Sequence, residues 1–186
     1  MTDLMIILGV PASGKTTLAR QLAAALSVPC LCKDDVKEAL FDAFGMGERA
    51  PGERTPSDRA ASKRLSEASF AALLRLARIQ LEAGLSCLVE GNWRPNHADG
   101  LRAVLEATGA RVAQIGCHSP PLEIVRRFRA RRRHPGHPDA EVSEDELKRA
   151  SAQPLFLELE GARFAYDGAA PAAYEELLRQ LKLWRL

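Results

Sequence analysis

The sequence lacks the patterns that mark zinc-binding, membrane-spanning and secreted proteins. Only four of its 186 residues are cysteine and none lies in a Cys-x-x-Cys pair, which argues against a zinc site. No apolar stretch approaches the roughly 20 residues of a membrane span, and the N-terminus lacks the basic region and cleavage site of a signal peptide. We therefore expect a cytoplasmic protein with buried, reduced thiols at Cys30, Cys32, Cys87 and Cys117, the first two on one face of a strand.

The charge balance excludes further classes. The formal net charge is only +2, too small to indicate nucleic acid or anionic lipid as a partner. The hydrophobic fraction of 46% and the charged fraction of 27% are those of an ordinary soluble globular protein. At about 150 residues per domain, and without an internal repeat or a low-complexity linker, the chain is predicted to form a single domain over residues 1–186.

Short apolar runs alternate with amphipathic stretches, which is typical of βαβ units and a mostly parallel sheet. A Gly/Pro-rich loop is expected over 45–56, followed by a helix N-cap at Thr55-Pro56-Ser57-Asp58. Ser119-Pro120 and the capping box Ser143-x-x-Glu146 each predict a further helix start. The predicted strands are 4–8, 28–32, 85–90, 112–117 and a weak fifth at 163–166, and the other predicted helices are 15–26, 36–44, 97–108 and 171–183.

The most specific motif is a phosphate-binding loop. Gly9-Val-Pro-Ala-Ser-Gly14-Lys15-Thr16 fits the Walker A pattern G-x-x-x-x-G-K-[ST] at every fixed position, between a predicted strand and a predicted helix. Backbone N–H groups at such a helix start cradle phosphate, the lysine reaches the β/γ oxygens and the threonine hydroxyl binds Mg²⁺. The predicted nucleotide-binding residues are Gly9, Pro11, Ala12, Ser13, Gly14, Lys15, Thr16 and Thr17.

Four segments together resemble a family. GVPASGKTTLARQLA (9–23), CKDDVKEAL (32–40), CLVEGNW (87–93) and RRFRARRRHPGH (126–137) are similar to P-loop kinases of the polynucleotide kinase, zeta toxin and chloramphenicol phosphotransferase group. The resemblance covers about residues 4–135. It implies an α/β fold, a three-layer αβα sandwich around a five-stranded parallel sheet of order 2-3-1-4-5, with a lid at about 119–150. It also implies transfer of a phosphoryl group from ATP, with Mg²⁺, to a hydroxyl.

An acidic pair follows the second predicted strand, at the sheet edge where such folds bind ligands. Phosphoryl transfer to an alcohol needs a carboxylate that orients the hydroxyl and takes its proton. In the family pattern Asp-Asp-x-Arg the first acid is the base, which corresponds to Asp34. The arginine is replaced by Lys37, which keeps the charge but loses the two-pronged contact to a substrate anion. Asp35 is either a substrate contact or the N-cap of the helix that follows.

Glu90 ends the third predicted strand, where P-loop proteins usually carry an aspartate that supports Mg²⁺. It could hold the metal together with Thr16, contact substrate instead, or simply face solvent. Asn92 and Trp93 follow on the same edge as candidate substrate contacts, with packing in the core as the alternative for Trp93.

Six arginines crowd residues 126–133. A basic run can be a solvated face or a nucleic-acid patch. Arg127 and Arg131, however, are spaced four apart, as on one helical face, and match the lid arginines of the family, which stabilise the transferring phosphoryl group. We therefore predict Lys15, Asp34, Arg127 and Arg131 as catalytic residues. His134 and His137 stand in a Pro/Gly turn, which favours a hinge or packing role over metal binding.

Three classes of function compete. A GTPase would need Asn-Lys-x-Asp, which is absent, and a nucleic-acid motor would need a larger chain. The prediction is an ATP-dependent kinase acting on a small-molecule hydroxyl, with a polynucleotide 5′-hydroxyl kinase and an acceptor-free ATPase or switch protein as alternatives. The near-neutral charge and the lack of an aromatic-studded basic groove favour the small molecule.

Overall fold

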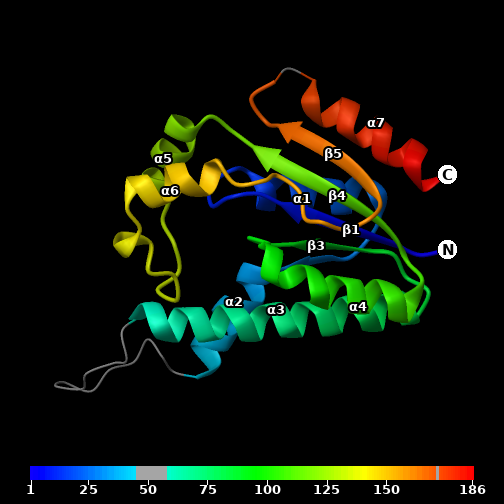
Figure 1. The fold of residues 1–186 in the computed structure, drawn as a ribbon, viewed down its shortest axis with the longest axis horizontal. Coiled ribbons are helices and arrows are strands. Elements are labelled where there is room, and N and C mark those ends of the chain that lie inside the picture. Colours follow the sequence, from blue (N-terminus) through cyan, green and yellow to red (C-terminus); the bar gives the residue numbers. More distant parts are fainter. Residues whose placement is uncertain (45–57, 171) are drawn as a thin grey trace.

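The structure is a computed structural model that describes residues 1–44, 58–170 and 172–186. Five parallel strands form one sheet in the order β2-β3-β1-β4-β5 (Figure 1). The predicted strand order and αβα architecture are confirmed. The strands are β1 (Asp3–Leu8), β2 (Cys30–Cys32), β3 (Cys87–Glu90), β4 (Arg111–His118) and β5 (Ala162–Asp167).

Helices cover both faces of this sheet. α3 (Asp58–Glu82) and α4 (Ala98–Thr108) lie on one face, and α1 (Lys15–Leu26) and α7 (Ala173–Arg185) lie on the other (Figure 1). The remaining helices are α2 (Lys33–Ala43), α5 (Pro121–Ala130) and α6 (Glu144–Ser151). α5 and α6 pack against each other at the end of the molecule toward which the strands point, so they stand over the sheet edge that carries the predicted site (Figure 1).

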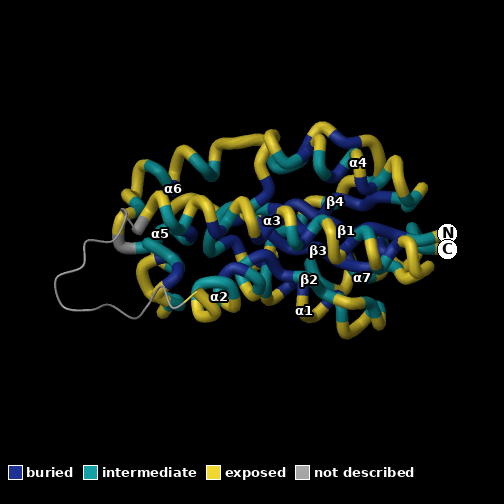
Figure 2. Tube along the Cα trace, turned by 90° about the horizontal axis from the view of Figure 1, so that it is seen from below, coloured by how far each residue is buried: buried dark blue, intermediate teal, exposed yellow. Residues whose placement is uncertain are grey.

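The two cores follow from the two-residue period of the central strand. Leu4 and Ile6 of β1 pack under α3 and α4, whereas Met5 and Ile7 pack under α1 and α7, and all four are fully buried. Figure 2 shows the same arrangement, with buried residues concentrated in the strands between exposed outer helix faces. Each such side chain contributes roughly 1.5–3 kcal/mol to the stability of the fold.

Several local predictions can be compared with the structure. The capping box is confirmed, since Ser143 Oγ accepts from Glu146 N–H at 3.2 Å while a Glu146 carboxylate oxygen accepts from Ser143 N–H at 2.9 Å. The helix start predicted at Ser119-Pro120 is confirmed, because α5 begins at Pro121 with Pro120 as its N-cap, but no side chain caps the helix, so Ser119 does not act as a cap. Cys30 is half-buried rather than buried, although its Sγ lies 3.5 Å from Cys32 Sγ, on the same face as predicted.

The predicted loop 45–56 and the N-cap residues 55–57 lie outside the described residues. None of the described helices has the length and hydropathy of a membrane span.

A buried glutamine holds the chain that returns from α6 to β5. Gln114 on β4 is fully buried, and its amide oxygen accepts from Leu157 N–H at 2.8 Å. Its amide nitrogen donates to the carbonyls of Leu157 and Leu159 at 3.2 and 3.3 Å. Arg163 donates to the same two carbonyls, so Leu157 N–H is the group that depends on Gln114 alone among these.

Replacing Gln114 by methionine should therefore destabilise the fold by about 1–3 kcal/mol, the cost of leaving one buried backbone N–H without a partner. We expect the midpoint of thermal unfolding to fall by roughly 2–10 °C in a chain of this length. Gln180→Met, which removes an amide that donates to Glu176 on the surface of α7, is the control and should change the midpoint little. Equal midpoints for Gln114→Met and the wild type would contradict the assigned role.

Candidate active site

The glycine-rich loop connects β1 to α1 and leads into a helix N-terminus. Gly9 has a φ of 147°, and a Cβ atom there would lie 2.5 Å from the carbonyl oxygen of Cys117 on the adjacent strand, so the position requires glycine. Gly14, with a φ of 92°, is the N-cap of α1. The free N–H groups of the first helical turn therefore begin directly after the loop, an arrangement that binds anions.

Lys15 and Thr16 at this helix start meet Glu90 at the end of β3. Lys15 Nζ donates to the Val10 carbonyl oxygen at 3.1 Å and lies 3.7 Å from Glu90 Oε1, while Thr16 Oγ1 donates to Glu90 Oε2 at 3.3 Å. Burial raises the pKa of the Glu90 carboxyl, and the Lys15 charge opposes this shift. A hydroxyl and a carboxylate are oxygen donors of the kind that Mg²⁺ prefers, so this pair fits the predicted metal position. Across the described residues, no three His, Cys, Asp or Glu side chains gather into a metal-binding group.

A cavity of about 840 Å³ opens beside this loop. Its walls come from the phosphate-binding loop, the first turns of α2 and α3, the end of β3, and the segment from α5 through α6. Among the residues that the structure describes, nine cationic and four anionic side chains line it, so this described lining carries an excess of positive charge. The cations are Lys15, Lys33, Lys37, Arg59, Arg94, Arg127, Arg131, Arg133 and Arg149, and the carboxylates are Asp34, Glu90, Asp139 and Glu146.

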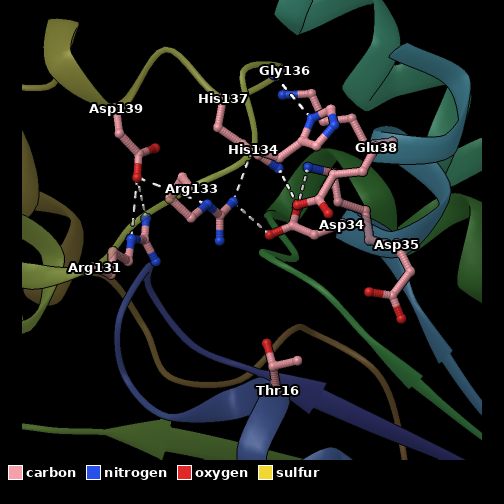
Figure 3. Close-up of polar contacts among 12 residues, drawn as sticks. Thr16, Asp34, Asp35, Glu38, Arg131, Arg133, His134, Gly136, His137 and Asp139 are labelled. Atoms are coloured by element: carbon pink, nitrogen blue, oxygen red, sulfur yellow. Dashed lines mark hydrogen bonds and ion pairs between the residues drawn. The ribbon is translucent and has the colours of Figure 1, made fainter. Parts of the chain in front are cut away.

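Asp34 lies in the cavity wall on the first turn of α2 (Figure 3). Lys33 Nζ donates to its Oδ1 and Arg133 Nη2 donates to its Oδ2, both at 2.9 Å. Burial alone would raise the pKa of this carboxyl, but the two cations outweigh burial and hold the pKa well below its usual range. The predicted base is thus an ionised carboxylate.

Asp35 takes neither of its two predicted roles, the helix N-cap and the substrate contact. α2 begins at Lys33 with Cys32 as N-cap, so Asp35 lies inside the first turn and does not cap the helix. Its carboxylate points away from Asp34 in Figure 3 and forms an exposed ion pair with Arg20 at 3.3 Å. Asp35 does not line the cavity, which removes the geometric support for a substrate contact.

The other predicted substrate residues separate into two groups. Lys37 lines the cavity, is 3% exposed, and donates to Ser62 Oγ on α3 at 2.6 Å. Burial, together with the neighbouring Lys33 charge, lowers the pKa of Lys37 to about 8. Asn92 also lines the cavity. Trp93, in contrast, is buried against Phe70 with ring centroids 4.8 Å apart, and it lines a second chamber of about 430 Å³. The lining residues that this chamber shares with the main cavity are Val10, Asn92, Arg94, Ala150 and Gln153.

Arg127 and Arg131 both line the cavity, but not for the predicted reason. α5 ends at Ala130 and Arg131 is extended, so the two arginines do not share a helical face. Arg127 Nε donates to Glu123 at 2.6 Å. Arg131 donates from Nε and Nη2 to Asp139 Oδ2 at 3.1 and 2.9 Å, and its guanidinium stacks on the Phe128 ring at 4.3 Å. The end of α5 and the extended backbone at Arg131 thus place this guanidinium where a continued helix would not.

Several residues that line the cavity were not predicted from the sequence. Arg59 and Ser62 line the cavity from the first turns of α3, where their spacing of three is a visible signal, and Arg94 follows β3. The contacts of Arg133 and His137 with α2 were missed as well. Their partners are 99 residues away, and no local pattern reports such a pairing.

Comparisons with known proteins bear on this geometry. A family described as AAA domain matches residues 4–154, which include the phosphate-binding loop, Asp34, Glu90 and the arginine cluster. The chain belongs to this family. The match ends before β5 and α7, which complete the sheet and one helical layer of this AAA-domain protein. No curated protein matches the chain.

Solved structures resemble the AAA-domain chain over nearly its whole length. A candidate kinase from Chloroflexus aurantiacus is 27% identical with a TM-score of 0.84, covering 98% of this chain and 97% of its own. A gluconokinase from Sinorhizobium meliloti is 15% identical with a TM-score of 0.53, covering 98% and 97%. A shikimate kinase from Acinetobacter baumannii, solved with shikimate, is 18% identical with a TM-score of 0.53, covering 99% and 93%. The last two show the fold alone.

Proposed function

We propose that this protein is an ATP-dependent phosphotransferase that moves the γ-phosphoryl group of ATP to a hydroxyl of a small molecule. The observation that carries the proposal is that Lys15, Thr16 and the ionised Asp34 line one cavity. A triphosphate on the loop and an alcohol beside Asp34 would share that cavity. The kinase-like fold and the kinase names of the similar structures support the reaction class.

Each group then has a role. The loop N–H groups and Lys15 bind the phosphates, and Thr16 and Glu90 would hold Mg²⁺, which supplies charge neutralisation of the β- and γ-oxygens when bound. Asp34 orients the acceptor hydroxyl. The hydroxyl oxygen bonds to the γ-phosphorus, the bond from that phosphorus to the bridging oxygen breaks, ADP leaves, and the hydroxyl proton passes to Asp34. Residues 119–150 act as the lid that brings Arg127 and Arg131 to the transferring group.

The charge of the lining favours an anionic acceptor. In the described part of the lining, nine cations face four carboxylates. Lys37 has a serine hydroxyl but no carboxylate as a hydrogen-bond partner among the described residues. A hydroxy acid or a phosphorylated alcohol would pair with these cations. Phe128 is the one Phe, Tyr or Trp that lines the cavity within the described chain, and it already stacks on Arg131. The stacking platforms that bind nucleic-acid bases are thus missing from the described lining, which weighs against a polynucleotide acceptor.

A transfer screen tests the function. Mg·ATP labelled at the γ-phosphate is incubated with the protein and four acceptor classes: hydroxy acids, phosphorylated alcohols, neutral sugars and oligonucleotides with a free 5′-hydroxyl. We expect labelled product from one of the first two classes. Product from oligonucleotides alone would replace the small-molecule proposal by the polynucleotide kinase, and hydrolysis unchanged by any acceptor would support the ATPase or switch protein.

The two lid arginines should act on the transfer step. Removing a guanidinium that contacts charge developing in the transition state lowers kcat by about 10²-fold while ATP affinity changes little. We expect this for Arg127→Ala and Arg131→Ala, measured as kcat for transfer and as Kd for ATP. Arg132→Ala, from the same cluster but outside the cavity lining, is the matched control. A change confined to salt-dependent binding of nucleic acid would show that the cluster is an electrostatic patch instead.

A further inference from the structure

A row of acidic side chains on α2 faces the turn that follows the arginine cluster. Asp34, Glu38 and Asp42 are spaced four apart and so lie on one side of the helix. Arg133 contacts Asp34 and His137 contacts Glu38, both at 2.9 Å (Figure 3). His134 contacts Asp42 at 3.0 Å. The candidate base is therefore one end of a continuous contact between α2 and residues 133–137.

The hydrogen bonds of His137 define its ionisation and its tautomer. Its ring lies between Arg133 Nη2, 2.8 Å from Nδ1, and Glu38 Oε1, 2.9 Å from Nε2. Because a guanidinium can only donate, Nδ1 must accept, and the single ring proton must be on Nε2, donating to Glu38. Burial, reinforced by the Arg133 charge, lowers the pKa of His137 to about 3, although Asp34 acts in the opposite direction. The ring is neutral throughout the physiological range.

The Arg133 guanidinium lies against Asp34, His137 and Asp139. Nη2 donates one hydrogen to Asp34 and the other to His137, so both of its hydrogens are used. Asp139 Oδ2 lies 3.9 Å from its Nε and also accepts from Arg131. A guanidinium constrained in this way presents a fixed donor to Asp34 Oδ2, while Lys33 occupies Oδ1. Each carboxylate oxygen keeps a further lone pair for an acceptor hydroxyl.

We propose that Arg133 is a positioning residue that fixes the Asp34 carboxylate for the acceptor hydroxyl, and that neutral His137, anchored on Glu38, holds Arg133 in place. The catalytic meaning of this arrangement rests on the proposed function. Phosphoryl transfer passes through a loose transition state, so an oriented, ionised carboxylate matters more than a strongly basic one. Two cations on its two oxygens provide both properties.

The charges around Asp34 come from three elements and all enter its titration. Those on α2 are Lys33, Lys37 and Glu38, those on the segment after α5 are Arg131, Arg133, His137 and Asp139, and Glu90 ends β3. Removing Arg133 leaves Lys33 as the one cation bonded to the carboxylate within the described chain. Because an adjacent opposite charge lowers a carboxyl pKa by roughly 1–3 units, its loss should raise the pKa of Asp34 by at least about one unit.

The test is an NMR titration of the Asp34 side-chain ¹³C carboxyl signal, assigned by its loss in Asp34→Asn, down to the lowest pH at which each variant stays folded. Arg133→Gln should shift the pKa upward by about one unit or more, and Arg133→Lys, which keeps the charge, should shift it less. An unchanged pKa in Arg133→Gln overturns the proposal. If Arg133→Gln does not fold, Arg133→Lys and the His137 variants still decide, because each keeps the positive charge beside Asp34.

Two His137 variants separate the two hydrogen bonds of the ring. Asparagine places an acceptor near the Nδ1 position and can keep the bond from Arg133, whereas glutamine places a donor near Nε2 and can keep the bond to Glu38. We expect His137→Gln, which loses the bond from Arg133, to raise the pKa of Asp34 most, and His137→Asn, which loses only the anchor on Glu38, to raise it less. The opposite order would show that His137 only ties the turn to α2. His134→Asn is the control, since it removes a contact of similar length to Asp42 without touching Arg133, and it should leave the Asp34 titration unchanged.

The titration and the transfer assay together separate the positioning role of Arg133 from the proposed kinase function. The titration needs no acceptor, so it reports on Arg133 even if no transfer is found. If the protein transfers phosphate but the pKa of Asp34 is unchanged in Arg133→Gln, the positioning role is refuted and the proposed kinase function stands. With activity present, Arg133→Lys should lower kcat at constant ATP affinity, because it keeps the charge but loses the fixed donor geometry.

Discussion

Replacing Lys15 by methionine is expected to lower kcat/KM for ATP by roughly 10³-fold, because a fixed cation on the β/γ oxygens contributes to both binding and transition-state stabilisation. Methionine preserves the apolar stem of a side chain that is only 8% exposed. It also removes the cation that lies 3.7 Å from buried Glu90. The Glu90 pKa, already raised by burial, should then rise further, so the variant is compared with the wild type by thermal unfolding as well.

Lys63→Met on the outer surface of α3 is the control for the loss of one lysine, since its side chain is 79% exposed. ATP affinity is measured by calorimetry with Mg²⁺ present and turnover by the transfer assay. A folded Lys15→Met protein with wild-type affinity and turnover would show that the loop does not bind the nucleotide phosphates. Loss of folding in Lys15→Met alone would call for Lys15→Arg, which keeps the charge beside Glu90.

Asp34→Asn is expected to lower phosphoryl transfer by about 10²–10⁴-fold with little change in ATP affinity, because asparagine keeps the size of the side chain but cannot take the proton of the acceptor. The substitution also removes the negative charge that Lys33 and Arg133 face. Some loss of stability is therefore expected. The kcat of the variant is compared with that of the wild type at a temperature well below the midpoint of thermal unfolding of both proteins.

The pH dependence of the Asp34 effect has a defined sign. Its folded-state pKa is lower than the unfolded value, so its contribution to stability is fully present above the unfolded value of about 3.9 and is lost as the pH falls through the folded pKa. The wild type should accordingly keep its transfer rate to a lower pH than an ordinary aspartate base would allow.

Asp35→Asn is the matched control for Asp34→Asn. Asp35 is exposed, lies outside the cavity lining and pairs with exposed Arg20, an interaction worth about 0–1 kcal/mol at most. We expect nearly unchanged transfer. If Asp35→Asn is inactive and Asp34→Asn is active, the base is Asp35. If both remain fully active, Glu90 is the next candidate.

Local signals explain what could be predicted from the sequence. The strand, the glycine loop and the helix that follows occupy consecutive residues, so the Walker A pattern contains both the fold element and its chemistry. The parallel sheet could likewise be predicted from alternating segments, and Gly109 ends α4 as its position suggests, with a φ of 62°. Asp34 and Glu90 were predictable because the ends of parallel strands meet at one edge of a sheet.

The remaining features depend on contacts between distant segments. Residues 133–137 contact α2 across 92 to 99 residues of sequence, and Pro135 and Gly136 lie in a turn whose direction a helical period cannot give. Gly136 packs so closely on Phe41 that a Cβ atom would lie 3.1 Å from its ring. Asp35 illustrates a smaller error. An acidic residue before an apolar helix reads as a cap, but the helix had already begun two residues earlier, at Lys33.

The excess of cations around the cavity also acts on molecules that are still free in solution. Its field extends into solvent over roughly 8 Å at physiological ionic strength and draws anions toward the opening before any hydrogen bond forms. A polyanion such as ATP, the proposed phosphoryl donor, would therefore be captured faster than a neutral molecule of its size. Added salt would slow that capture more than it would speed release, since release depends on short-range contacts that salt screens less. The ionic strength around the protein thus becomes a control on how often the site is filled.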